Sequence, residues 1–432
     1  MRYILLCFIY FINSTFNSQA QTWGPPMRVP PTPDSPFVPA LPGSLSWDQQ
    51  ERTRATNQDL IRRERQRQDN QQEALRELRQ EEQARQANEQ ARQQFMLANR
   101  QRYELAYQEL QGMLESRQPP SLKRAVFLTE NAFLNGGLNY AEFSTGIYAL
   151  GRMCYLLTGD SARPDPAARF LALHRLMTDT VRLERPGLAG VLHPPPRYDF
   201  EDFWGREDFT KQFVSKLLAT NAGQCHSMPW LYKLVAEELG IKAYLSMAPS
   251  HMYIQVKDNG GALYSYETTN GHFVSDAYYA TSVYIKAAAL RQRTYLDTLT
   301  RRETLACAVF DLADGYAHRY GYDALAEKYI ALGLRYYPHS MQGRILAHDA
   351  AFLRFQAAWQ AAGQPTQDQA RQSPALHPLL AAVEQRTRAL DELGYEEMPA
   401  AQYSRWLQQV EEEKTRRAGQ QAATRFGKTV QN

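Results

Sequence analysis

The sequence predicts an α+β protein that is mostly helical and contains one small antiparallel sheet. From Asp48 to Gln111 the chain has neither Gly nor Pro and consists chiefly of strong helix formers. Further helical patterns, separated by glycine breaks, occur before residue 200 and after residue 300. Residues 251–268 instead have the composition of two short strands joined by a turn. We expect this sheet to pack on a helix that begins near Cys225, followed by a C-terminal helical hairpin.

The N-terminus has the pattern of a cleaved signal peptide. A basic residue, Arg2, precedes an apolar run from Tyr3 to Ile12, and Ser18-Gln19-Ala20 supplies a small-x-small cleavage site. We therefore expect an exported protein, periplasmic or secreted. Cys7 lies inside the apolar run, where it is not placed for lipid attachment. No later stretch approaches the ~20 apolar residues of a membrane-spanning helix, so no transmembrane anchor is expected.

Composition excludes several classes of protein. A net charge of +3 over 432 residues is too small to predict nucleic-acid binding. Four cysteines are too few for a disulfide-stapled scaffold, and three of them follow the signal peptide. Cys154 and Cys307 lie in amphipathic helical segments, which predicts buried thiols, with a disulfide between them as the alternative. Cys225 is expected to be free.

The order of patterns predicts seven segments. They are a signal peptide (1–20), a Pro-rich linker (21–47), a long Gln/Arg/Glu-rich helical arm (48–118), a helical subdomain (119–200), the segment with the sheet (201–299), a helical hairpin (300–361) and a helical or disordered tail (362–432). The arm has 13 acidic and 13 basic side chains from Asp48 to Arg117. This balance predicts a solvated helix or a coiled coil that needs a partner, and it argues against nucleic acid or anionic membranes.

Helices are predicted throughout the rest of the chain. Their expected ranges are Ser121–Leu134, Tyr140–Leu157, about Pro166 to Arg182, Thr304–Arg319, Ala324–Tyr336, Leu376–Leu393 and Ala400–Arg416. In the fifth of these, Ala326, Ile330, Gly333 and Pro338 have the spacing of the second helix of a tetratricopeptide repeat. One such unit predicts a helical buttress rather than a peptide-binding array, because a stable array needs about three repeats.

The helix after residue 224 has clear boundaries. Pro229 would clash with the carbonyl of residue 225 in a helix interior, so the helix cannot begin much before Cys225. Gly240 ends it in the left-handed cap position. Cys225 therefore belongs to the first turn, where free backbone N–H groups and the helix dipole favour a thiolate and can hold an oxyanion.

Two strands follow this helix, at His251–Lys257 and Ala262–Thr268. A three-residue loop with Gly260 left-handed would pair residues whose numbers sum to 518 and set His251 directly opposite Glu267. A two-residue turn would make the sum 519 and place Met252 opposite Glu267. The apolar pattern favours the first register, in which a carboxylate lies beside the imidazole as in a catalytic triad.

This stretch resembles the transglutaminase-like superfamily, to which papain-like proteases are distantly related. The resemblance is carried by Gly223-Gln224-Cys225, Leu239-Gly240-Ile241, Pro249-Ser250-His251 and Glu267-Thr268-Thr269-Asn270-Gly271. With the preceding Phe213–Leu218 it is similar to exported proteins of Bacteroidetes-type bacteria that join this module to a tetratricopeptide-like unit. The resemblance implies Cys225 as nucleophile and His251 as base. Glu267 stands where the family has Asp, so Asn270 or Asp276 could share the third role.

Other side chains are candidates for the cleft. Gln224 and Gln212 are candidate oxyanion donors, Trp230 and Trp204 candidate groove residues, and His226 either lines the cleft or makes hydrogen bonds in the core. We expect no cofactor or metal. Zinc bound by Cys225, His226, His251 and His272 would need an unfamiliar spacing, and no acidic loop has calcium-ligand spacing.

Two functions are compatible with these patterns. The first is a cysteine-dependent amide hydrolase or acyltransferase that acts on peptide or protein substrates through an acyl-cysteine intermediate. The second is a catalytically inactive scaffold that binds a protein partner through the 48–118 arm or the tetratricopeptide-like helices. The sequence specifies neither the substrate nor the oligomeric state.

Overall fold

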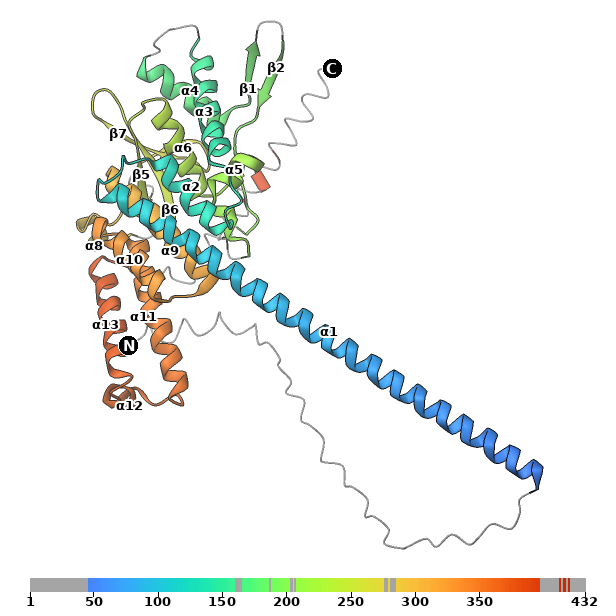
Figure 1. The fold of residues 1–432 in the computed structure, drawn as a ribbon. Helices are drawn as coiled ribbons and strands as arrows, with labels where there is room; N and C mark the ends of the chain where they lie inside the picture. Colours follow the sequence, from blue (N-terminus) through green and yellow to red (C-terminus); the bar gives the residue numbers. More distant parts are fainter. Residues whose placement is uncertain are drawn as a thin grey trace. The chain divides into compact units, whose positions relative to one another are not determined.

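A computed structural model describes residues 46–159, 165–185, 188–202, 205, 207–275, 279, 285–396 and the isolated positions 412, 415, 416 and 419. Outside them lie the expected signal peptide with Cys7, nearly all of the Pro-rich linker, most of Ala400–Arg416, and two candidate residues, Trp204 and Asp276. The chain is mostly helical with small, chiefly antiparallel sheets, which confirms the predicted α+β class (Figure 1).

In chain order the described helices are α1 (Trp47–Leu114), α2 (Leu122–Phe133), α3 (Tyr140–Leu157), α4 (Pro166–Thr178), the 3₁₀ helix η2 (Phe209–Gln212), α5 (Val214–Thr220), α6 (Ser227–Glu238), α8 (Ala287–Arg291), α9 (Arg301–Tyr320), α10 (Ala324–Tyr336), α11 (Met341–Ala361), α12 (Gln367–Gln372) and α13 (His377–Glu392). Helices α2, α3, α9, α10 and α13 agree closely with the predicted ranges, whereas η2, α5, α8, α11 and α12 had no predicted range. Side-chain caps account for several starts. Ser121 accepts from Arg124 N–H at α2, and Thr300 forms a capping box with Glu303 at α9.

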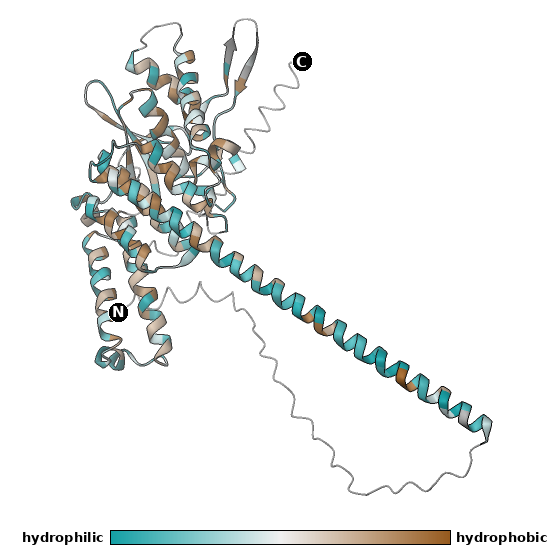
Figure 2. Ribbon diagram, in the orientation of Figure 1, coloured by the Kyte–Doolittle hydropathy of each residue, from teal (hydrophilic) through white to brown (hydrophobic). Residues whose placement is uncertain are grey.

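The chain divides into two compact units, residues 1–86 and 87–432, and α1 crosses the boundary between them. In the first unit the α1 side chains that the structure describes are exposed, and Figure 2 shows this part of the helix as almost entirely hydrophilic. In the second unit Tyr103, Leu110 and Leu114 of α1 are fully buried against the core. Among the described residues, no helix has both the length and the apolarity needed to cross a membrane.

A four-stranded antiparallel sheet lies in the second unit. Its order is β5 (Ala243–Ala248), β6 (His251–Lys257), β7 (Leu263–Glu267) and β8 (His272–Val274). Two of these strands, β5 and β8, were not predicted. Helix α6 packs on one face through Tyr232, whose ring lies 5.2 Å from that of Tyr266. The other face is covered by residues 285–299, so β6 is buried on both faces over most of its length.

The predicted pairing of β6 with β7 is wrong by two residues. Ile254 pairs with Tyr266 and Val256 with Tyr264, so paired numbers sum to 520 rather than 518 or 519. The loop has three residues as predicted but begins one residue later, and Gly261 rather than Gly260 has positive φ, at 92°. Asp258 selects this turn. Its N–H donates to Ala262 O, and its Oδ1 accepts from Ala262 N–H at 2.8 Å.

An antiparallel pair of strands, β1 (Val181–Arg185) and β2 (Leu188–His193), was not predicted. The helix expected from about Pro166 to Arg182 ends at Thr178, and β1 pairs with β2. The β-branched pair Thr180-Val181 favours the extended backbone found there. A two-residue parallel bridge joins β3 (Arg197–Tyr198) to β4 (Ala222–Gly223), immediately before the Cys225 turn.

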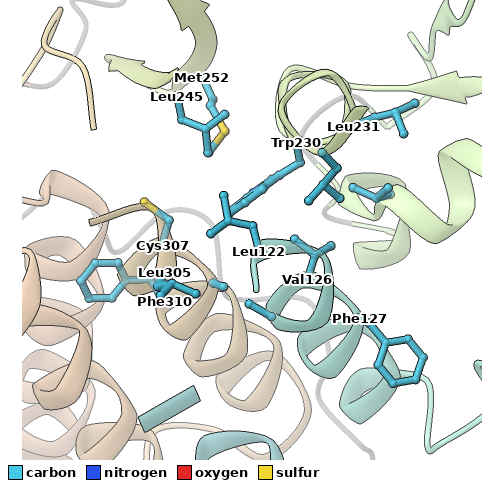
Figure 3. Packing of buried hydrophobic residues seen from close by; sticks show 14 of the residues in the cluster. Leu122, Val126, Phe127, Trp230, Leu231, Leu245, Met252, Leu305, Cys307 and Phe310 are labelled. Carbon is cyan, nitrogen blue, oxygen red and sulfur yellow. The ribbon is translucent and has the colours of Figure 1, made fainter. Parts of the chain in front are cut away.

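The main hydrophobic core joins α6, the sheet, α2 and α9. Trp230, only 1% exposed, projects from α6 into this core, and Figure 3 shows its ring near Leu122, among Leu245, Met252 and Cys307. The predicted burial of Cys154 and Cys307 is confirmed. Both thiols are free, so the alternative of a disulfide between them is wrong. Burial raises the pKa of Cys154 to about 12 and that of Cys307 well above its usual value.

Candidate functional site

Cys225 lies in the turn that leads into α6. The first regular residue of the helix is Ser227, but Met228 N–H already donates to Gln224 O at 3.0 Å, so the helical hydrogen bonding encloses Cys225. The predicted helix limits are confirmed at both ends, since Gly240 has φ +65° after the last turn. The free thiol of Cys225 is partly exposed, unlike those of Cys154 and Cys307.

The backbone at Gly223 and Gln224 lies close to the Ser227 side chain in this turn. Gln224 N–H donates to the buried hydroxyl of Ser227 at 2.9 Å. A Cβ atom on Gly223 would lie 2.8 Å from that hydroxyl and about 3 Å from the Leu217 methyl groups. Only glycine therefore fits at position 223 while Ser227 holds the turn.

The segment between β3 and α5 supports the turn from outside. Asp199 N–H donates to Gly223 O at 2.8 Å, and Gln224 Nε2 donates to Asp202 O at 2.9 Å. Asp199 is itself bound by Lys211 and Lys216. Gln224 is thus buried and bound to a backbone carbonyl, and its side chain positions this segment beside Cys225.

His251 connects Cys225 with Glu267. Its Nε2 atom lies 2.5 Å from Oε2 of Glu267, and the Cys225 side chain is near enough to the ring to help raise the pKa of His251. Because Glu267 occupies Nε2, Nδ1 is the ring nitrogen that remains for the thiol. The structure therefore brings the three predicted residues together.

The Glu267 carboxylate is buried and receives hydrogen bonds at both oxygens. Oε1 accepts from the N–H of Thr269 at 3.1 Å and from its hydroxyl at 2.8 Å. Oε2 accepts from the hydroxyl of Tyr279 at 3.0 Å as well as from His251. These donors hold the carboxylate in one orientation, so the imidazole is held too.

Electrostatics favour an ion pair between partly buried His251 and buried Glu267. Burial opposes the charge on His251, but the negative charge of Glu267, the nearby Cys225 side chain and the hydrogen bond to Glu267 raise its pKa well above the usual value. Burial likewise opposes the charge on Glu267, but the His251 imidazolium and the Thr269 donors lower its pKa. The raised pKa of His251 and the lowered pKa of Glu267 both favour the charged forms, a carboxylate beside an imidazolium.

His226 makes hydrogen bonds in the core, which was one of the two roles expected for it. Its Nδ1 lies 3.1 Å from Gln212 O and its Nε2 lies 3.1 Å from Oδ1 of Asp311 on α9. Burial opposes its charge, yet Asp311 and the Gln212 carbonyl raise its pKa to about 9. Gln212 thus contributes its carbonyl here, and its side chain lies against Gly205.

The remaining candidates have other positions. Trp230 was predicted as a groove residue, and this is wrong, because its side chain fills the core. Asn270 Oδ1 accepts from His272 N–H within the turn after β7. Sequence reasoning missed Tyr279 and Asp311. The repeated threonines after Glu267 were a signal for Thr269, since Thr hydroxyls bond locally in turns. For Tyr279 and Asp311 the sequence contains no such signal.

Within the part of the chain that the structure describes, no group of three or more His, Cys, Asp or Glu side chains is arranged to bind a metal ion. Each of the two histidines nearest the thiol instead faces a carboxylate. The arrangement as a whole places a partly exposed thiol near an oriented imidazole and presents backbone N–H groups at a helix start, which are the parts that nucleophilic catalysis uses.

Comparison with known proteins identifies no family. No family model matches the chain, and no curated protein matches it. Among solved structures, a crystal structure of menin, described as revealing the binding site for the Mixed Lineage Leukemia (MLL) protein, is similar over 71% of this chain and 88% of its own. The sequence identity is 12% and the TM-score is 0.29, a likeness too low to inform either fold or function.

Proposed function

We propose that this protein is an exported thiol enzyme that hydrolyses or transfers amide bonds of peptide-like substrates through an acyl-cysteine intermediate. One observation carries the proposal: a single imidazole, that of His251, is hydrogen bonded to a buried, fully satisfied carboxylate and has the Cys225 thiol near enough to interact with its charge. This is the relationship among nucleophile, base and orienting acid that defines a triad.

Acylation would begin with the Cys225 thiolate and the His251 imidazolium. The sulfur attacks the carbonyl carbon, and a C–S bond forms. The imidazolium then gives its proton to the nitrogen, the C–N bond breaks, and the amine leaves. Glu267 remains a carboxylate throughout, stabilises the imidazolium before transfer, and keeps Nδ1 directed at the sulfur.

Deacylation would reverse the proton flow. Neutral His251 removes a proton from water or from an acceptor amine, whose oxygen or nitrogen attacks the thioester carbon. The C–S bond breaks, the thiolate returns, and His251 is again an imidazolium. Backbone N–H groups at Cys225 and His226, which precede the first helically bonded amide at Met228, are the candidate donors to the oxyanion in both steps.

The family and location are part of the same proposal. The order of a Cys before a helix, a His that begins one strand and an acid that ends the next resembles the transglutaminase-like superfamily. The α9–α10 hairpin would be its tetratricopeptide-like buttress, and Gly333 and Gly343 let α10 and α11 approach Phe310 of α9 closely. Cleavage after Ala20 would deliver the protein to the periplasm or the exterior.

Alkylation of the thiol tests the proposal without knowledge of the substrate. Iodoacetamide should modify Cys225 in the native protein, because Cys154 and Cys307 are buried. His251→Ala should slow this modification about 100-fold. The site of labelling is mapped by peptide mass spectrometry, and a cysteine-reactive peptide amide probe should show the same dependence.

His318→Ala is the matched control, because it removes an exposed imidazole of α9 whose ring stacks on Phe209. It should react like the wild type, and Cys225→Ala should not be labelled. Equal labelling rates for the wild type and His251→Ala would exclude the enzyme and leave the scaffold.

A partner-binding scaffold is the second candidate. It is favoured by the exposed apolar residues along the first unit's part of α1, which are Leu60, Ile61, Leu75 and Leu78. Apolar side chains on an otherwise hydrophilic helix are typical of a coiled-coil strand without its partner. Circular dichroism of the full chain with and without residues 47–86, with sedimentation to detect association, would test this function.

A further inference from the structure

A second His–carboxylate pair, partly buried, flanks the candidate nucleophile. His226 follows Cys225 directly in the chain, and its ring nitrogens lie 3.1 Å from two oxygen atoms, Gln212 O and Asp311 Oδ1. Neither oxygen belongs to the turn itself: one comes from the end of η2 and the other from α9.

The identity of these oxygens determines the protonation state of the ring. A backbone carbonyl only accepts hydrogen bonds, so Nδ1 must carry a proton. Asp311 Oδ1 accepts a hydrogen bond, at 3.1 Å, from Nε2 of Gln342, and as an ionised carboxylate it can only accept from Nε2 of His226 as well. An imidazole with both nitrogens protonated is a cation.

We propose that His226 is a positioning residue that keeps a permanent positive charge beside Cys225 and thereby favours the thiolate and attracts anionic groups to it. This inference rests on the proposed function, since it concerns the same thiol, but it assigns a second imidazolium to the site in addition to His251. Asp311 of α9 stabilises that cation, so the helical hairpin takes part in thiol reactivity.

Other charged groups face His226 from the elements around it. They are Glu130 of α2 and Asp311 and Asp314 of α9, together with Cys225. Burial raises the pKa of Glu130 and of Asp314 to about 7 each, so near neutral pH neither is fully charged. Asp311 is therefore the carboxylate that directly balances the His226 cation, while His226 also interacts electrostatically with the Cys225 thiol.

The rates of an anionic and a neutral alkylating reagent report this charge. The ratio of the iodoacetate rate to the iodoacetamide rate at Cys225 depends on the local electric field, whereas a purely structural change alters both rates together. Loss of one nearby positive charge should lower this ratio about fivefold. We therefore expect His226→Gln to lower it by that factor.

Asp311→Asn is the second variant and preserves the shape of the site. Asparagine can still accept through its oxygen but no longer stabilises a cation, so it should lower the ratio in the same direction. His318→Gln, which removes an exposed imidazole from the same helix, should leave the ratio at the wild-type value. Thermal melting confirms that each variant is folded.

The outcomes separate this inference from the proposed function. If His251→Ala slows alkylation while His226→Gln and Asp311→Asn both keep the wild-type ratio, the second cation is refuted and the enzyme proposal survives. If His251→Ala has no effect, the enzyme proposal fails whatever the ratio shows. A lowered ratio in both variants, with the control unchanged, establishes the charge at His226.

Discussion

Glu267 lies diagonally across the β6–β7 pair from His251, not directly opposite it. Continued by one step, the observed register places Glu267 opposite Tyr253, two residues along β6 from His251. The two side chains still meet at 2.5 Å because a shift of two residues keeps both on the same face of the sheet. Diagonal neighbours are about 7–8 Å apart, a gap that only a long side chain spans. This explains why the position holds Glu.

The diagonal geometry predicts that a shorter acid fails. Glu267→Asp keeps the charge but withdraws the carboxylate from His251, from Tyr279 and from its own contact with Thr269. We expect the alkylation rate of Cys225 to fall about tenfold, the equivalent of one lost charged hydrogen bond. Glu142→Asp, an exposed change on α3, is the control and should react as the wild type. If Glu267→Asp were alkylated at the wild-type rate, the length of the side chain at position 267 would not determine the reactivity of Cys225.

The same pair predicts a pH window of stability. The usual values are 4.5 for Glu267 and 6.5 for His251, and folding lowers the first pKa and raises the second. The carboxylate's contribution is therefore lost as the pH falls below 4.5 through the lowered value. The imidazolium's contribution is full below 6.5 and is lost as the pH rises through the raised value.

Urea denaturation of the wild type and Glu267→Gln tests this window. Between pH 4.5 and 6.5 the wild type should be more stable by about 2 kcal/mol. That difference should shrink at lower and at higher pH, because all other groups titrate alike in the two proteins. A difference that does not change with pH would contradict the ion pair.

A buried carboxylate outside the site predicts a structural effect. Glu130 of α2 accepts from the N–H groups of Val214 and Ser215, at 2.6 and 2.8 Å, at the start of α5. Glu130→Ala would leave two donors without a partner, the buried N–H of Val214 and the partly buried N–H of Ser215, and should lower the free energy of unfolding by about 3 kcal/mol. The exposed Glu142→Ala should lower it by about 0.5 kcal/mol. Similar losses in the two variants would show that the α5 cap is not important.

Two glycines should respond in opposite directions to the same substitution. A Cβ on Gly223 would collide with Ser227, so Gly223→Ala should destabilise the fold by about 2 kcal/mol and displace the Cys225 turn. A Cβ on Gly146, inside α3, would lie 3.6 Å from Leu218, an ordinary contact. Gly146→Ala should therefore stabilise the protein by about 1 kcal/mol. Thermal melts and Cys225 alkylation of both variants provide the measurement.

Local chemistry alone determined the boundaries of several helices and strands in this protein. The ranges of α3, α10 and β6 follow from patterns that need no partner, namely 3.6-residue periodicity, flanking breaks and β-branched content. Pro229 and Gly240 determined the limits of α6 by backbone sterics. These limits placed Cys225 at a helix start before any tertiary contact was known.

The tertiary structure decided the β6–β7 turn, the position of Trp230 and the partners of Glu267 and His226. For each of these features the local sequence allows alternatives of nearly equal energy. Either Gly260 or Gly261 could take the left-handed position, and the bonds between Asp258 and Ala262 select the second. Trp230 could have lined a groove, but α2 and the sheet enclose it. The partners Tyr279 and Asp311 lie 12 residues from Glu267 and 85 from His226. Such long-range pairs leave no periodicity in a sequence, since only the folded core brings them together.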